Sequence, residues 1–315
     1  MCAEWQQHNK RARTAHQHYL ADKALHTNEN YVLFSTDMQK VIMLPTMPSV
    51  ESAVFTRRLV AFHQTLAPLG SRTKAHPAVG VVWHEATAGR SAEDVASAFI
   101  KCLQSDSYRD AKHSVFWCDN CAGKNNNWTL DTALCFAVNK TSGPDKITLR
   151  YLERGHTLMS VDSFHASVEK SIKQKVNIYD FSDFLDAVNK NGVSVEMQPA
   201  DFADWPNGQS SAKFTRKPLL KDVSEVQFRR GESKMFWKRS FEEPIHEEGE
   251  FLKKNVARCV LKSSLPINRT TARGICSSKK ADVAKLCPLM PANRTDFWKT
   301  LPENAKAVDL LVNFE

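Results

Sequence analysis

Apolar, strand-like runs alternate with helix-like segments from residue 78 to residue 172, and this alternation constrains the fold more than any other feature of the sequence. Three strand and helix pairs are expected in succession: 78–84 with 91–104, 113–117 with 128–138, and 147–152 with 160–172. Strands that are joined through helices pair in parallel, with right-handed crossovers. The alternation therefore predicts an α/β fold, in which a sheet is flanked by helices.

Three further apolar runs precede this region, and the connections between them are short. Residues 31–37 and 41–44 are expected to be strands, whereas periodicity leaves 59–66 open between a strand and a short helix. Strands joined by short connections pair antiparallel. The complete sheet is therefore expected to be mixed, with an antiparallel part from the early strands and a parallel part from the later ones.

The chain has 315 residues and a formal net charge of +8, and the positive excess lies in one region. Residues 211–280 contain 17 lysines and arginines against 8 acidic residues. The extension that holds this region is expected to start with a polar linker at 204–219 and to form a β-hairpin that turns at Gly231. Composition and patterning thus predict three parts: a polar, frayed or helical lead-in at 1–28, an α/β domain at 29–203, and a small basic α+β extension at 204–315.

A localised basic surface favours a polyanionic partner, nucleic acid first, because lysine and arginine neutralise phosphates without reading sequence. The alternative is a solvated basic face that aids solubility. DNA is the predicted partner. Six side chains are candidate nucleic-acid contacts: Lys124, Arg229, Arg230, Lys234, Lys238 and Arg239.

Acidic residues stand where predicted core elements end. Asp37 ends the first strand, and Asp119 follows the second strand of the alternating region. On the last helix, Asp162 and Glu169 lie two turns apart on one face, with His165 between them. Taken singly, each acid could be a turn, capping or solvated residue. Together, two strand-end acids and a helix acid can hold two divalent ions.

Two divalent metal ions held in this way activate a water molecule or hydroxyl for phosphodiester chemistry. Hard oxygen ligands favour Mg²⁺ or Mn²⁺. The sequence therefore predicts a metal site on Asp37, Asp119 and Asp162, with Glu169 as the alternative third ligand.

Three segments resemble the motifs of a known family: Val79-Gly-Val-Val-Trp-His-Glu85, Trp117-Cys-Asp-Asn-Cys-Ala-Gly-Lys-Asn-Asn-Asn127 and Arg154-Gly-His-Thr-Leu-Met-Ser-Val-Asp-Ser-Phe-His-Ala-Ser-Val-Glu-Lys170. They are similar to the W-H-E, D-x-C-x-G-Q-N-K-N and G-H-T-x-M-x-x-D-x-x-H patterns of transposase-derived proteins in animal genomes. The resemblance covers about residues 30–200. It implies the ribonuclease H-like fold of transposases and integrases, here with a small C-terminal α+β extension.

The resemblance also implies roles for individual residues. It makes Asp37, Asp119 and Asp162 the metal ligands. His156, His165 and Glu169 are then catalytic neighbours in the same site. Lys124 stands where the family pattern has glutamine. Members of this family usually carry a longer, often cysteine-rich N-terminal region, so residues 1–28 are expected to be the remnant of one.

Other chemistries have weaker signals. Cys118-Asp-Asn-Cys121 is a single C-x-x-C pair, which cannot complete a tetrahedral zinc site. These cysteines with His156 or His165 would suit a thiol hydrolase, although no spacing favours it. His84-Glu85 could line the site or be structural.

The sequence predicts an intracellular protein, nuclear or cytoplasmic. It has no apolar run long enough to span a membrane and no apolar signal core at its N-terminus. Its eight cysteines are expected to be reduced thiols. Two functional hypotheses follow: a metal-dependent nuclease or strand-transfer domain, and a protein that keeps the fold without catalysis and binds nucleic acid or protein. Affinity for Mn²⁺ separates them.

Overall fold

The computed structural model describes residues 3–25, 30–121, 124–206, 217–264 and 266–310. Three sequence-based predictions fall partly outside these ranges: residues 1–2 and 26–28 of the lead-in, Gly123 of the turn after Asp119, and 207–216 of the linker. The helices are α1 (Ala3–Ala24), α2 (Glu51–Phe55), α3 (Ala92–Leu103), α4 (Trp128–Asn139), α5 (Ser160–Lys175), α6 (Phe181–Asn189), α7 (Lys254–Leu261), α8 (Ser277–Ala284) and α9 (Thr295–Thr300).

The described strands form one mixed sheet, ordered β10-β9-β8-β6-β5-β1-β3-β4-β7, with β2 paired to β3 beside this path. The strands are β1 (Tyr31–Met38), β2 (Ile42–Leu44), β3 (Leu59–Pro68), β4 (Val79–His84), β5 (His113–Cys118), β6 (Lys146–Tyr151), β7 (Val193–Glu196), β8 (Glu225–Arg229), β9 (Lys234–Lys238) and β10 (Glu247–Glu250). The predicted α/β class with a mixed, helix-flanked sheet is confirmed.

Both predicted pairing modes occur in the sheet. β1, β5 and β6 run in parallel; β5 and β6 are joined through α4, whereas β2, β3 and β4 lie in the chain between β1 and β5. β3 pairs antiparallel with β1, β2 and β4. The ambiguous segment 59–66 is thus a strand, and every residue of β3 is buried. A strand buried on both faces shows no apolar–polar alternation, which is why periodicity left it undecided.

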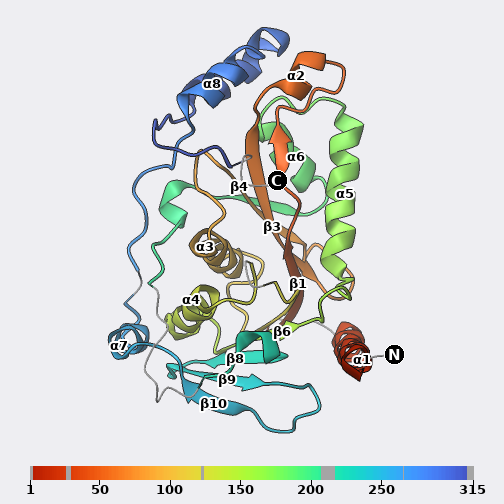
Figure 1. The fold of residues 1–315 in the computed structure, drawn as a ribbon, viewed down its shortest axis with the longest axis vertical. Coiled ribbons are helices and arrows are strands. Elements are labelled where there is room, and N and C mark those ends of the chain that lie inside the picture. The colour runs from red at the N-terminus through yellow and green to blue at the C-terminus, as the bar shows by residue number, and fades with distance from the viewer. Residues whose placement is uncertain (1–2, 26–29, 122–123, 207–216, 265, 311–315) are drawn as a thin grey trace.

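Helices cover the two faces of the sheet (Figure 1). α3 and α4 lie on one face, where Phe34, Phe62 and Phe116 pack with Phe99 of α3. α5 and α6 lie on the other face, where Leu33, Ala61 and Trp117 pack with residues of α5. Because side chains alternate along a strand, odd-numbered residues of β1, β3 and β5 point toward α5. The same alternation decides to which face of the sheet the candidate acids point.

The basic C-terminal extension continues the sheet. β8 pairs antiparallel with β6, and β9 and β10 follow it. The hairpin predicted around Gly231 is formed by β8 and β9. The boundary predicted at 203/204 therefore falls within one continuous sheet. Among the described residues, no helix combines the length and the apolar character that crossing a membrane requires.

Candidate functional site

Asp37 and Asp119 lie side by side at one edge of the sheet. In the parallel pairing of β1 with β5, Ser35 is opposite Trp117 and Thr36 is opposite Cys118. The next residues in this register are Asp37 and Asp119. Both have the parity of Trp117, so both carboxyl groups point to the face covered by α5. The structure thus brings together two of the predicted metal ligands, which are 82 positions apart in sequence.

The two carboxyl groups interact electrostatically with each other and with Lys124. Burial raises the pKa of Asp37 above its ordinary value, Lys124 lowers it, and the neighbouring Asp119 raises it. Lys124 Nζ lies 3.4 Å from Asp37 Oδ1. The Asn125 amide donates a hydrogen bond of 2.5 Å to Asp119 Oδ1. The pair is therefore partly neutralised by groups from the loop that follows β5.

Helix α5 passes over this edge, and its candidate site residues Asp162, His165 and Glu169 follow one another along it at intervals of about one turn. Val161 N donates to Ser35 Oγ near the middle of β1. One turn later, His165 Nε2 lies 3.1 Å from the Thr65 hydroxyl, and Thr65 is the cross-strand partner of Asp37. α5 therefore runs alongside β1 toward the edge. His165 is level with Asp37, Asp162 lies one turn before it, and Glu169 lies one turn beyond.

The two helix acids have different surroundings. Asp162 is exposed, and its Oδ2 accepts a hydrogen bond of 2.7 Å from the Met159 N–H at the start of α5. Glu169 Oε1 lies 3.4 Å from the amide nitrogen of Gln39, two residues beyond Asp37. Of the two predicted third ligands, Glu169 is thus the one that the structure places near the end of β1, whereas Asp162 caps its own helix.

A buried hydrogen-bond network lies beneath these groups. Gln39 Oε1 is 2.7 Å from His63 Nδ1, and His63 Nε2 is 2.9 Å from the Thr65 hydroxyl. Thr65 in turn contacts His165. Burial lowers the pKa of His165 to about 4 and that of His63 well below its usual value, so both rings are neutral. One arrangement satisfies every bond: His63 donates from Nδ1, Thr65 donates to His63, and His165 donates from Nε2.

This network was not predicted, although the sequence carries a signal for it. His63, Gln64 and Thr65 are three consecutive polar residues in an otherwise apolar strand, and alternation places His63 and Thr65 on one face. Gly80 of the neighbouring strand leaves room for the ring, since a Cβ there would lie 2.4 Å from His63 Nε2. The network fixes His165 and Gln39 around Asp37.

The donor set fits a divalent metal ion only in part. Two adjacent carboxylates supply the hard oxygen ligands that Mg²⁺ and Mn²⁺ prefer. Among the described residues, however, no group of three or more histidine, cysteine, aspartate or glutamate side chains is placed to hold a metal ion. The predicted third ligand Asp162 is engaged elsewhere, and the Lys124 ammonium adjoins Asp37.

The remaining candidates have surroundings of their own. His156 is exposed, with its ring centroid 5.4 Å from that of His8 in α1. His84 is buried against Phe181, and burial lowers its pKa to about 4. Cys118 is fully buried on the α3 and α4 face, and burial raises the pKa of its thiol well above the usual value. A thiolate nucleophile paired with His165 is not formed, because His165 lies on the opposite face.

Five of the six predicted nucleic-acid contacts are spread along the extension, and the sixth, Lys124, adjoins Asp37. Arg229 stacks on Phe236, and Arg230 binds Asp145 at the sheet edge opposite to the carboxylate pair. Lys234, Lys238 and Arg239 lie along β9 and just after it, and Lys234 and Arg239 pair with Glu248 and Glu247 respectively. In the register of β9, β8, β6 and β5, Lys238 is level with Trp117. Lys238 and Arg239 therefore lie at the edge that carries Asp119.

Comparisons with known protein families, curated proteins and solved structures found no match to this chain. The interpretation of the site therefore rests on its geometry and on the sequence motifs.

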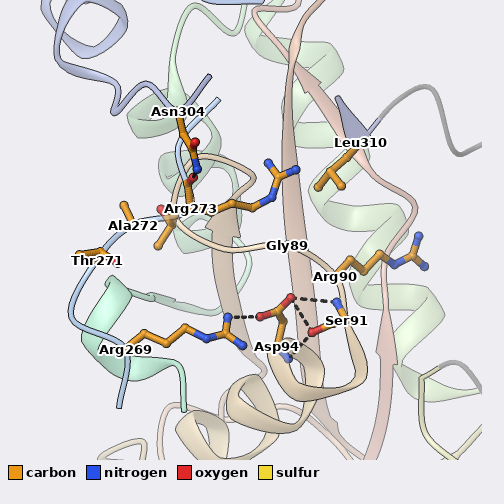
Figure 2. A pocket seen from close by; sticks show the side chains of 11 residues that line it. Gly89, Arg90, Ser91, Asp94, Arg269, Thr271, Ala272, Arg273, Asn304 and Leu310 are labelled. Carbon is orange, nitrogen blue, oxygen red and sulfur yellow. Dashed lines mark hydrogen bonds and ion pairs between the residues drawn. The ribbon is translucent and has the colours of Figure 1, made fainter. Parts of the chain in front are cut away.

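A pocket of about 730 Å³ opens beside the carboxylate edge (Figure 2). It lies between the loop that leads into α3 and the C-terminal segment, and Arg90 Nε at its rim is 3.1 Å from Met38 Sδ. Figure 2 shows Arg269 directed at Asp94, which also bonds Ser91. Arg269 pairs with two further acids, and Arg273 donates to backbone carbonyls. We therefore assign these two arginines to anchoring the C-terminal segment.

Proposed function

We propose that this chain is a ribonuclease H-like domain of transposon origin that carries a phosphodiester-cleaving or strand-transfer site for DNA, dependent on Mg²⁺ or Mn²⁺. The observation that carries the proposal is the juxtaposition of Asp37 and Asp119 at the ends of adjacent parallel strands. Strand ends of this kind are where open α/β sheets place their sites.

The strand order supports the same proposal. The central strands run β4-β3-β1-β5-β6, in which β3 is antiparallel to its neighbours and β1, β5 and β6 are parallel. Helices follow β4, β5 and β6. This is the arrangement expected of a ribonuclease H-like fold, with the first acid on the first strand and the second on the next parallel strand.

Each residue at the site has a distinct part. Asp37 and Asp119 would hold a metal ion, which supplies a Lewis acid that activates water and stabilises a leaving oxygen. The neutral His165 is held beside Asp37 by Thr65, where its other ring nitrogen can accept a proton. Glu169 at the same edge is the acid available to complete the ligand set.

Two observations favour a second function. The ammonium of Lys124 adjoins Asp37, and Asp162 is used as a helix cap. A protein that retains the fold and binds nucleic acid without cleaving it would tolerate both features. Metal affinity distinguishes this candidate from the first.

Titration of Mn²⁺ by calorimetry tests the proposal. We expect measurable binding by the wild type and its loss in Asp119→Ala, because the pair supplies the two direct carboxylate ligands. Asp110→Ala is the matched control, since Asp110 is an exposed acid on the loop before β5. Equal binding by the wild type and Asp119→Ala would contradict a metal site on this pair.

The position of the basic residues predicts how DNA binds. If DNA reaches the carboxylate edge, Lys238→Ala should weaken binding and lower the slope of log affinity against log salt by about 1, as expected for one lost phosphate contact. Lys234 lies at the other end of the same strand and provides the control. Equal losses for Lys234→Ala and Lys238→Ala, measured by fluorescence anisotropy across a salt series, would place DNA elsewhere.

A further inference from the structure

Lys124 reaches the carboxylate pair from the loop between β5 and α4. Its Nζ lies 3.4 Å from Asp37 Oδ1 and 3.4 Å from the carbonyl oxygen of Met38. The side chains of Lys124 and Asp37 are each only 22% exposed, so water screens this ion pair less than one on the open surface. The ammonium therefore provides a positive charge next to the site where a divalent ion is expected.

The loop fixes the direction of this lysine. The Lys124 N–H donates to the Cys121 carbonyl, and the Asn127 side chain donates to the Lys124 carbonyl. The adjacent Asn125 is fully buried and donates to Asp119. The backbone around Lys124 is thus bonded to the end of β5 and to the start of α4, which presents the ammonium to Asp37.

The surrounding acids show how the charge is balanced. Two like charges at neighbouring strand ends repel each other, and a cation beside them relieves the repulsion. Asp162 accepts the Met159 N–H, and Glu169, the acid available to complete a ligand set, contacts Gln39. Next to Asp37 the structure therefore places the Lys124 ammonium rather than a third carboxylate.

We propose that Lys124 is the built-in cation of the Asp37–Asp119 pair and that it competes with divalent metal ions for this position. The inference rests on the proposed function, since it concerns the same two carboxylates. Metal binds only when the ammonium moves away from Asp37, so the affinity of the wild type is set by the cost of displacing Lys124. Removing its charge converts a weak metal site into a stronger one.

Calorimetric titration of Mn²⁺ into the metal-free chain, without DNA, tests the proposal on the wild type, Lys124→Met and Lys124→Gln. Both variants remove the charge, and the glutamine keeps a hydrogen-bond donor. We expect each to bind Mn²⁺ at least about tenfold more tightly, because a positive charge next to a divalent ion is removed. Lys40→Met is the matched control: Lys40 is an exposed lysine close to Asp37, and its replacement should change affinity less than about twofold.

Thermal unfolding gives a second readout that does not depend on activity. Without metal, Lys124→Met should melt below the wild type, because Asp37 and Asp119 lose their cation. Added Mn²⁺ should raise the melting temperature of Lys124→Met more than that of the wild type, as ligand binding to the folded state requires.

The outcomes separate this inference from the proposed function. Equal Mn²⁺ affinity in the wild type and both Lys124 variants would overturn the inference and leave the metal site standing. Binding by the Lys124 variants that persists after Asp119→Ala would overturn it also, because the ion would then bind elsewhere. An absence of Mn²⁺ binding in all of these proteins would overturn both the inference and the proposed function.

Discussion

Replacement of Lys279 by methionine is expected to lower the free energy of unfolding by about 3–5 kcal/mol, the usual cost of removing one partner from a buried ion pair. Lys279 lies on α8 with its side chain 1% exposed. Its Nζ is 2.6 Å from Glu85 Oε1 and 2.5 Å from Asp309 Oδ1. Methionine fills the same space but leaves two buried carboxylates without this cation.

The cluster joins the C-terminal segment to the end of β4. Glu85 follows β4 directly and also accepts the Val60 N–H of β3, so one carboxylate links α8 to two strands. Glu85 belongs to the W-H-E motif and was considered as a residue that could line the site. In the structure its carboxylate pairs with the buried Lys279 instead. Loss of the lysine is therefore expected to loosen the C-terminal segment and destabilise the sheet edge together.

Urea denaturation measures the effect, and two further variants control it. Lys285→Met removes an exposed lysine of the same region, paired with Asp282, and should change stability by less than about 0.5 kcal/mol. The double variant Lys279→Met with Glu85→Gln removes opposite charges together and should recover part of the loss. A Lys279→Met protein as stable as the wild type would show that the buried cluster contributes nothing.

The sequence predicted the central part of the fold because local pattern and topology agree there. Strand and helix periods from residue 78 to residue 172 differ clearly, and parallel strands joined through helices must end at one edge. Asp119 follows one of these strands, whereas strand 31–37, which Asp37 ends, was expected only in the antiparallel part of the sheet, so its parallel pairing with β5 was not predicted from the alternation. The face to which both carboxyl groups point depends on the register that pairs Ser35 with Trp117, which the sequence alone did not predict.

The features that the sequence could not predict, such as the burial of Lys279 and the docking of helix α1, depend on contacts between distant segments. Lys279 and Lys280 are adjacent and chemically identical, and only the approach of Glu85 and Asp309 buries the first. Helix α1 has no clear apolar stripe, and it is held by Tyr19 packing on Trp117. Such contacts join residues between 30 and 194 positions apart, so no local window of sequence contains them.

Asp131 is a further residue whose surroundings no local window of sequence reveals. An acid in the first turn of a helix is favoured electrostatically, which is a sufficient local explanation for Asp131 at the start of α4. In the structure it is fully buried, and neither carboxyl oxygen has a hydrogen-bond partner among the described residues. Burial raises its pKa from 3.8 to about 8. A local role as a first-turn acid does not explain a carboxyl group held in its neutral form.

Replacement of Asp131 by asparagine is expected to stabilise the protein near neutral pH. The folded state keeps a proton that the unfolded chain releases between pH 3.8 and about 8, so stability falls as pH rises through this window. Because pH 7 is about three units above the pKa of the unfolded chain, the protein loses about 4 kcal/mol of stability at that pH. Asparagine cannot ionise and leaves an unpaired amide that costs about 1 kcal/mol, for a net gain of about 3 kcal/mol. At about pH 4 the gain should vanish, because the unfolded chain then releases only part of the proton and the remaining loss is smaller than the cost of the unpaired amide.

Denaturation of wild type and Asp131→Asn at about pH 4 and about pH 7 measures both the gain and its pH dependence. Asp296→Asn is the matched control, an exposed acid in the first turn of α9, and should change stability by less than about 0.5 kcal/mol at either pH. A variant less stable than the wild type at pH 7 would mean that the carboxylate is ionised and paired.

A buried acid without partners costs stability at any position in a protein, and such groups cluster at functional sites. Since Asp131 begins the helix that follows the Asp119 loop, Mn²⁺ affinity should be measured on Asp131→Asn as well as on the Lys124 variants.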